Sequence, residues 1–336
     1  MHVFYLNIPW IIDERDYNCS IRSAEEWKGR GSVNEFQGAY FSISGTLFLI
    51  IYIIAMISLV RAKLMHIPCY KLMFFNGLID MLCIIVGSLV VAYIDFTGTV
   101  FCNSIAFSQT FGHVGWSVWI GSTFSCITLA FNRVAEMLPI MKPVRFLFRK
   151  KFLYMWMILC IAVMTLRPFV TRPTLYSSSA AAFMAAPLIS DDIQWEVSYY
   201  TSVLLPVHNV MVVVILVILY SILCYYVVSM SKGSTTRIER VHLELFAQSL
   251  VICVSTATAA ILYVILVFVP VHKYIVIAAN VIWQLSHGIH GMVYIAINRN
   301  IRSEAISLFL RQNTGNNVKV QLSFTKSSHC DQAPSS

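Results

Sequence analysis

Seven long apolar stretches, separated by short polar segments, dominate the chain. Several of them reach or exceed the ~20 residues that a helix needs to cross ~30 Å of hydrocarbon. The stretches are continuously apolar, whereas the strands of a membrane barrel would alternate at every second residue. Because backbone groups in lipid must hydrogen-bond internally, the pattern predicts membrane-spanning helices. They cover residues 36–60, 72–94, 107–132, 152–170, 197–228, 245–270 and 274–297.

The composition agrees with a protein that lies mostly in a membrane. Of the 336 residues, 58% are hydrophobic and 12% are charged, which is about half the charged fraction of a soluble domain. We therefore predict an all-α membrane protein built as a seven-transmembrane helix bundle. A buried soluble core would not explain so many apolar stretches.

The distribution of charge predicts the orientation. With the N-terminus outside, the inner loops and tail hold 17 Lys and Arg against 5 Asp and Glu, while the outer segments hold 7 against 10. This excess of basic residues inside follows the positive-inside rule. The net charge of +8 therefore reflects topology and gives no support for nucleic-acid binding.

Four regions follow from this orientation. An extracellular N-terminal segment covers residues 1–35, and the seven-helix domain covers residues 36–297. Apolar residues at near-helical spacing, with arginines beside them, predict an amphipathic surface helix over residues 298–311. The polar residues 312–336 predict a disordered cytoplasmic tail.

Of the nine cysteines, only Cys19 and Cys102 are expected on the extracellular side. Cys102 precedes Arg133 by 31 residues, or ~46 Å of helix, so it lies in the outer loop and not on the membrane helix. Extracellular cysteines tend to pair, and we predict a disulfide that holds the N-terminal segment over the bundle; two free or intermolecular thiols are the alternative. Asn18 begins a glycosylation pattern, Asn-Cys-Ser, in which a cystine would hinder modification.

Several short motifs occur in a characteristic order. They are Tyr17-Asn18-Cys19-Ser20, Glu26-Trp27, Cys69-Tyr70-Lys71, Gly77-Leu78-Ile79-Asp80-Met81, Phe101-Cys102 and Leu129-Ala130-Phe131-Asn132-Arg133. In this order the chain resembles the nematode chemoreceptors called serpentine receptor class T, within the G-protein-coupled receptor superfamily. The resemblance covers nearly all of the chain before the tail.

The resemblance implies a rhodopsin-like bundle and a chemosensory function. The expected partners are a small-molecule or peptide ligand, a heterotrimeric G protein and membrane lipids, without a cofactor. The expected location is the plasma membrane, including the sensory cilium of chemosensory neurons. A ligand-gated channel or transporter is the alternative, although one membrane acid and no internal repeat argue against it.

At the inner end, the resemblance assigns Asn132 and Arg133, with Lys142 and Arg145 of the following basic loop, to G-protein coupling. Asn132 replaces the usual acidic residue and cannot form an ion pair with Arg133. An inactive-state lock therefore needs another partner, for which the candidates are Glu136, Glu239 and Glu244. The alternative is that the basic residues only determine topology or bind anionic lipid.

Asp80 is the only carboxylate inside a predicted span, and such an acid usually faces a polar partner. Matching of helix positions to rhodopsin-like receptors places Ser122, Ser286 and His290 beside it, with Tyr294 in the seventh-helix motif. This polar switch is either a proton-dependent Asp–His pair or a structural hydrogen-bond network.

Aromatic and histidine residues at outer or middle depth are candidates for a ligand pocket. They are His113, Trp116, Trp119, His208, Tyr263, Trp283 and His287. Packing or an interfacial aromatic belt explains each of them equally well. No charged residue is expected at this depth, which argues against a strongly ionic ligand unless the loops supply the charge.

Enzymatic chemistry has no support in the sequence. The chain has no P-loop, no His-Glu-x-x-His and no Gly-x-Ser-x-Gly. His287 and His290 lie three residues apart on one predicted helix, but without further matching ligands they do not predict a metal site. We expect a receptor that is not an enzyme.

Overall fold

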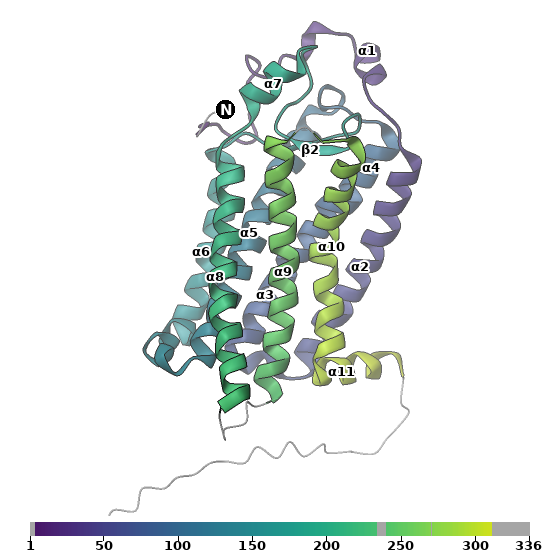
Figure 1. The fold of residues 1–336 in the computed structure, drawn as a ribbon. Helices are drawn as coiled ribbons and strands as arrows, with labels where there is room; N and C mark the ends of the chain where they lie inside the picture. Colours follow the sequence, from purple (N-terminus) through teal and green to yellow (C-terminus); the bar gives the residue numbers. More distant parts are fainter. Residues whose placement is uncertain (1–3, 234–239, 270, 311–336) are drawn as a thin grey trace, which may run out of the picture.

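The computed structural model describes residues 4–233, 240–269 and 271–310. Within them, seven long helical rods stand side by side, with the N-terminal segment at one end and α11 at the other (Figure 1). We call these the N-terminal end and the α11 end. The rods are α2 (Glu35–Arg61), α3 (Pro68–Ile84) continued by α4 (Val91–Thr97), α5 (Ile105–Met137), α6 (Lys150–Leu166), α8 (Leu204–Gly233), α9 (Arg240–Phe268) and α10 (Lys273–Ile297).

Length and hydropathy identify six of these rods as able to cross a membrane. The seventh, α10, is less apolar because Asn280, Gln284, His287 and His290 interrupt it. All four side chains are buried against neighbouring helices, so α10 places its polar residues inside the bundle. The predicted seven-helix membrane bundle is confirmed.

A π-helical turn, Ile85–Val90, joins α3 to α4 in one continuous rod. Gly87 lies in this turn against the indole of Trp283 on α10. A side-chain carbon on Gly87 would lie 2.0 Å from Trp283 Cζ3. The wide turn and the missing side chain together let α10 bring Trp283 close to the rod, and π-helical turns are frequent at functional sites.

The loop before α8 differs from the prediction. A hairpin of β1 (Leu175–Ser177) and β2 (Ala182–Met184) precedes a short helix, α7 (Ile193–Tyr200). The predicted start of the fifth span at residue 197 is therefore wrong, since α8 begins at Leu204. The side chain of Asp192 accepts the backbone N–H of Trp195 and so begins α7 as a separate helix.

The N-terminal segment is fastened over the bundle. Cys19 and Cys102 form a disulfide with 5.5 Å between their Cα atoms, as predicted. Cys102 lies on the 3-10 turn Phe101–Asn103, before α5 begins. It is therefore in the loop, as the helix-length argument requires.

An ion pair adds a second attachment. Arg172 donates to Asp16 at 2.6 Å, and both side chains are largely buried. Burial raises the pKa of Asp16, but hydrogen bonds from Tyr5, Tyr199 and Arg172 outweigh this effect and leave the pKa below its usual range. Asp16 therefore stays ionised and holds the segment to the loop between α6 and α7.

The opposite end carries α11 (Arg299–Phe309), which begins where the side chain of Asn298 accepts the backbone N–H groups of Asn300 and Ile301. Ile301 and Ala305 are buried, whereas Ile306 is 49% exposed. This two-sided pattern is that of an amphipathic helix. The predicted tail over residues 312–336 lies outside the described residues.

Candidate functional site

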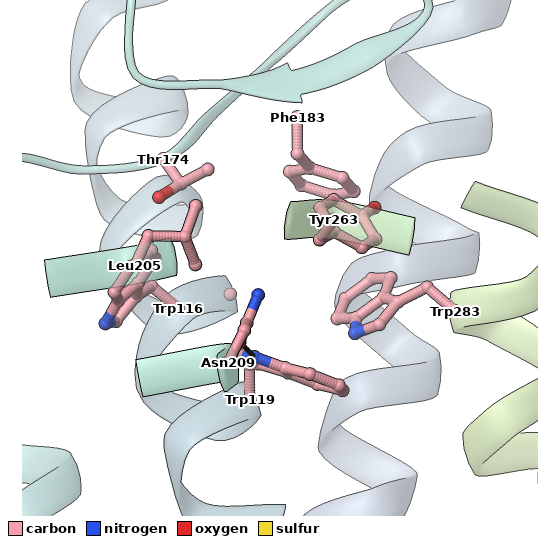
Figure 2. A pocket seen from close by; sticks show the side chains of 9 residues that line it. Trp116, Trp119, Thr174, Phe183, Leu205, Asn209, Tyr263 and Trp283 are labelled. Carbon is pink, nitrogen blue, oxygen red and sulfur yellow. Dashed lines mark hydrogen bonds between the residues drawn. The ribbon is translucent and has the colours of Figure 1, made fainter. Parts of the chain in front are cut away.

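A pocket lies at the N-terminal end, between α5, α8, α9 and α10 and beneath β2 (Figure 2). It continues into a larger cavity of about 290 Å³, near the lower limit of ordinary ligand pockets. The two share part of their lining. Residues that line the first are Gly115, Trp116, Trp119, Thr174, Phe183, Leu205, Asn209, Tyr263 and Trp283.

Two hydrogen bonds engage polar atoms of this wall. Trp119 Nε1 donates to Asn209 Oδ1 at 3.0 Å, and the Tyr263 hydroxyl donates to Asn280 Oδ1 at 2.8 Å. Trp116 Nε1 and Asn209 Nδ2 have no hydrogen-bond partner among the described residues, and the rest of the wall offers mainly aromatic faces to a bound molecule. Such a surface suits an apolar group, which gains from dispersion and from removal of apolar area from water.

The β1–β2 hairpin closes the pocket from above, and Figure 2 shows Phe183 pointing down from β2 toward Tyr263. The Phe183 ring meets Trp283 edge-on at 5.3 Å. The Asn280 amide donates to the carbonyl of Ala181 at 2.6 Å, which ties the hairpin to α10. The hairpin is thus a fixed part of the pocket wall.

His287 lies directly beneath the two pocket tryptophans. Its ring meets Trp119 edge-on at 5.8 Å and Trp283 edge-on at 5.6 Å. Its Nδ1 lies 2.9 Å from Asp80 Oδ1, and its Nε2 is buried without a hydrogen-bond partner among the described residues. One side chain therefore joins the pocket floor to the carboxylate inside the bundle.

Asp80 is completely buried, and five side chains lie within hydrogen-bond distance of its two oxygens. The distances to its carboxylate are 2.8 Å from Tyr52 Oη, 2.6 Å from Asn76 Nδ2, 3.0 Å from Ser122 Oγ, 2.9 Å from His287 Nδ1 and 2.8 Å from His290 Nδ1. A neutral histidine can donate through Nδ1. The carboxylate is therefore satisfied without requiring a charged imidazolium or a bound ion.

The polar switch predicted from the sequence is brought together only in part. Ser122 and His290 contact Asp80, but Ser286 does not, because its hydroxyl donates to the carbonyl of Trp283 at 2.7 Å. His287, placed in the pocket by the sequence, takes that position instead. Each step along a helix turns the side chain by about 100°, so an error of one residue changes the face.

Tyr52 and Asn76 were missed by the sequence reasoning. Asn76 lies four residues before Asp80 on the same helix face, a spacing that would have identified it. Tyr52 lies on α2, and nothing in the sequence pairs it with α3. It also meets Tyr294 edge-on at 6.0 Å, so the cluster continues from Asp80 toward the α11 end.

The other two predicted pocket histidines do not line the first pocket. The ring nitrogen Nε2 of His208 lies 2.9 Å from Thr123 Oγ1. His113 is buried, and neither of its ring nitrogens has a hydrogen-bond partner among the described residues. Trp116, Trp119, Tyr263 and Trp283 are the predicted residues that surround the pocket.

At the α11 end, Arg133 is buried and donates through Nη2 to Asn132 Oδ1 at 2.6 Å. Arg145 donates to the carbonyls of Ala135 and Glu136, at 2.8 and 2.7 Å. These carbonyls end α5, so Arg145 caps that helix.

Two further predicted residues, Lys142 and Asn18, lie at the surface. Lys142 is exposed, and Glu239, a candidate partner of Arg133, lies outside the described residues. Asn18 is exposed, and its side-chain oxygen accepts from the backbone and hydroxyl of Ser20 at 3.0 and 2.6 Å. Its glycosylation stays a prediction.

Comparison with known proteins finds one family and a curated relative. A family model described as "Serpentine type 7TM GPCR chemoreceptor Srt" matches residues 1–318. "Serpentine receptor class T-55" of Caenorhabditis elegans is 25% identical to this chain over 295 residues. The match covers 87% of this chain and 80% of the relative.

Proposed function

The chain belongs to the Srt family of serpentine seven-helix chemoreceptors, and on this premise we propose how it senses and signals. A small molecule binds in the pocket between α5, α8, α9 and α10. Binding favours a bundle arrangement that activates a heterotrimeric G protein at the α11 end. The ligand drives this change only through its difference in affinity for the two arrangements.

The proposed orientation places the N-terminal segment outside the plasma membrane of a sensory cell. The distribution of basic residues supports it. The Cys19–Cys102 disulfide supports it independently, because disulfides persist in oxidising compartments. The pocket then lies at the end of the bundle from which an external chemical arrives.

The contact that carries this proposal is His287, between the pocket tryptophans and Asp80. A ligand that displaces Trp119 or Trp283 must also move the His287 ring, because all three rings are packed together. That movement changes the hydrogen bond to Asp80 and thereby the contacts of Tyr52. Four helices, α2, α3, α5 and α10, meet at this cluster, so a local shift alters their packing.

At the α11 end, Arg133 and the exposed Lys142 are the proposed G-protein contacts. Arg133 is held by the neutral amide of Asn132, which gives a weaker restraint than a carboxylate. We propose that the receptor has measurable activity without ligand. A silent unliganded receptor would contradict this part of the proposal.

The proposed function is tested by nucleotide exchange. Purified receptor in lipid nanodiscs is mixed with heterotrimers that represent the main α-subunit classes, and GDP release is measured against empty nanodiscs. The expected result is faster release with at least one heterotrimer, and its loss in Arg133→Gln. Unchanged release with every heterotrimer, together with a ligand-gated current in cells that lack G-protein signalling, would favour a channel instead.

A further inference from the structure

Two arginines line the cavity of about 290 Å³, Arg167 and Arg172. Arg172 already has its counter-charge. It pairs with Asp16 at 2.6 Å, donates to the carbonyl of Tyr199 at 2.9 Å and lies over the ring of Tyr200. Its charge is therefore not available to a bound molecule.

Arg167 differs from Arg172 because no carboxylate of the described residues pairs with it. Its side chain is buried with 5% exposure, and Nη2 donates to the carbonyl of Arg172 at 3.1 Å. Nε and Nη1 have no hydrogen-bond partner among the described residues. Within that part of the chain, no carboxylate is paired with Arg167.

A buried guanidinium without a counter-ion is energetically costly. The indole of Trp116, 4.2 Å beneath the guanidinium carbon, offsets part of that cost through a cation–π contact. It leaves Nε and Nη1 without acceptors among the described residues. Nη2 uses one N–H for the carbonyl of Arg172, and its second N–H forms a two-donor edge with either Nε or Nη1. Two N–H donors on one side of a guanidinium match the two oxygens of a carboxylate.

The other residues of the cavity indicate the chemical character of the rest of the ligand. Phe183, Leu205, Tyr263, Leu266 and Val267 give it mostly apolar walls, and the aromatic pocket is continuous with it. A dianion would bring a second charge that Arg172, already paired with Asp16, does not neutralise. An inorganic ion would leave the apolar walls without contacts.

From these observations we infer that the pocket recognises a small monocarboxylate with an apolar body, whose carboxylate pairs with Arg167 and whose body lies against the aromatic wall. This inference rests on the proposed function and names the ligand class of the same pocket. The sequence predicted no charge at pocket depth. Arg167 reaches it from the turn Arg167–Phe169, which follows α6.

The test uses octanoate and octanamide, two probes of the same length that differ in charge. Binding to the purified full chain is measured by isothermal titration and by thermal shift in uncharged detergent. Octanoate is expected to bind at least tenfold more tightly than octanamide. Arg167→Gln is expected to weaken octanoate about 30-fold or more, as expected for a buried charge pair, and to leave octanamide nearly unchanged.

Lys28→Gln is the matched control, because it removes one positive charge from an exposed position of the same end. It should leave both affinities unchanged. Arg167→Lys keeps the charge but loses the two-donor edge, and should give an intermediate affinity. Retained octanamide binding in the Arg167 variants shows that their pocket is folded.

Four results would overturn the inference. In the binding assay, these are equal binding of the two probes by the unmodified chain, no binding of octanoate, and a preference for octanoate that survives in Arg167→Gln. In the thermal-shift assay, it is a shift from sodium chloride equal to the shift from octanoate at the same concentration. The assay contains no G protein. Octanoate binding without nucleotide exchange would therefore contradict the proposed function alone, and exchange driven only by uncharged molecules would contradict the ligand class alone.

Discussion

Gly87 lets the indole of Trp283 in the pocket wall pack directly against the α3–α4 rod. An added side-chain carbon there would lie 2.0 Å from Cζ3 and 2.7 Å from Cε3 of Trp283. Carbon atoms normally approach to about 3.5–4.0 Å, so the indole must retreat by about 1.5 Å or more. Its other neighbours are Phe183, Trp119 and His287. The ring therefore has to disturb either the pocket wall or the connection to Asp80.

Gly87→Ala should consequently destabilise the receptor. Overpacking of this kind costs about 1–3 kcal/mol, which corresponds to a fall in melting temperature of roughly 2–10 °C at the usual conversion. The assay is a thermal unfolding curve of the purified receptor, followed by thiol labelling of buried cysteines. Gly29→Ala is the matched control, since no atom lies within 4 Å of its added carbon.

A second substitution separates the clash from a general effect of alanine on the turn. Trp283→Phe removes the ring atoms that the new carbon would meet. The loss of unfolding free energy in the Gly87→Ala/Trp283→Phe double variant should therefore be smaller than the sum of the two single-variant losses. The difference should exceed the ~0.5 kcal/mol scatter of independent sites. Additive effects, or a Gly87→Ala variant as stable as the unmodified chain, would refute the reasoning.

Two further predictions concern the N-terminal segment. Cys19→Ser removes a disulfide that spans 83 residues. In the chain-entropy treatment this should lower the free energy of unfolding by at most ~4.5 kcal/mol. An unchanged melting temperature would contradict the attachment of the N-terminal segment to the bundle. The pKa of Asp16 in the folded protein lies below the usual 3.8. Its ion pair with Arg172 should therefore contribute its full stabilisation above pH 4, and this stabilisation should be lost as the pH falls through the pKa of the folded protein. Melting curves from pH 7 to pH 3 should therefore show an acid-dependent loss that is smaller in Asp16→Asn, and equal losses in both proteins would count against it.

The bundle could be predicted from the sequence because membrane-spanning helices leave a long, local signal. Seven apolar stretches specify seven rods, and the basic loops specify an orientation. The disulfide was also predictable, since helix length places Cys102 beyond the membrane core. The β1–β2 hairpin was not, because three-residue strands are too short for a periodic pattern.

The site was harder to predict because its contacts join distant parts of the chain. Asp80 was identifiable as an acid within an apolar stretch, but its bond to His287 spans 207 positions. The rotational position of α10 decided between Ser286 and His287, and apolar patterns do not determine it to one residue. Arg167 lies near the end of the predicted fourth span, and nothing local shows that the chain turns its side chain toward the pocket.

The central claim is that the pocket and the Asp80 cluster are coupled through His287. It is tested most directly by a double-mutant cycle of Trp283→Leu and Asp80→Asn, two residues joined by His287, measured as receptor-driven GDP release. The account predicts non-additive effects that exceed the ~0.5 kcal/mol expected of independent sites and become additive in a His287→Phe background. Additive effects in the unmodified background, or a coupling that His287→Phe leaves intact, would contradict it.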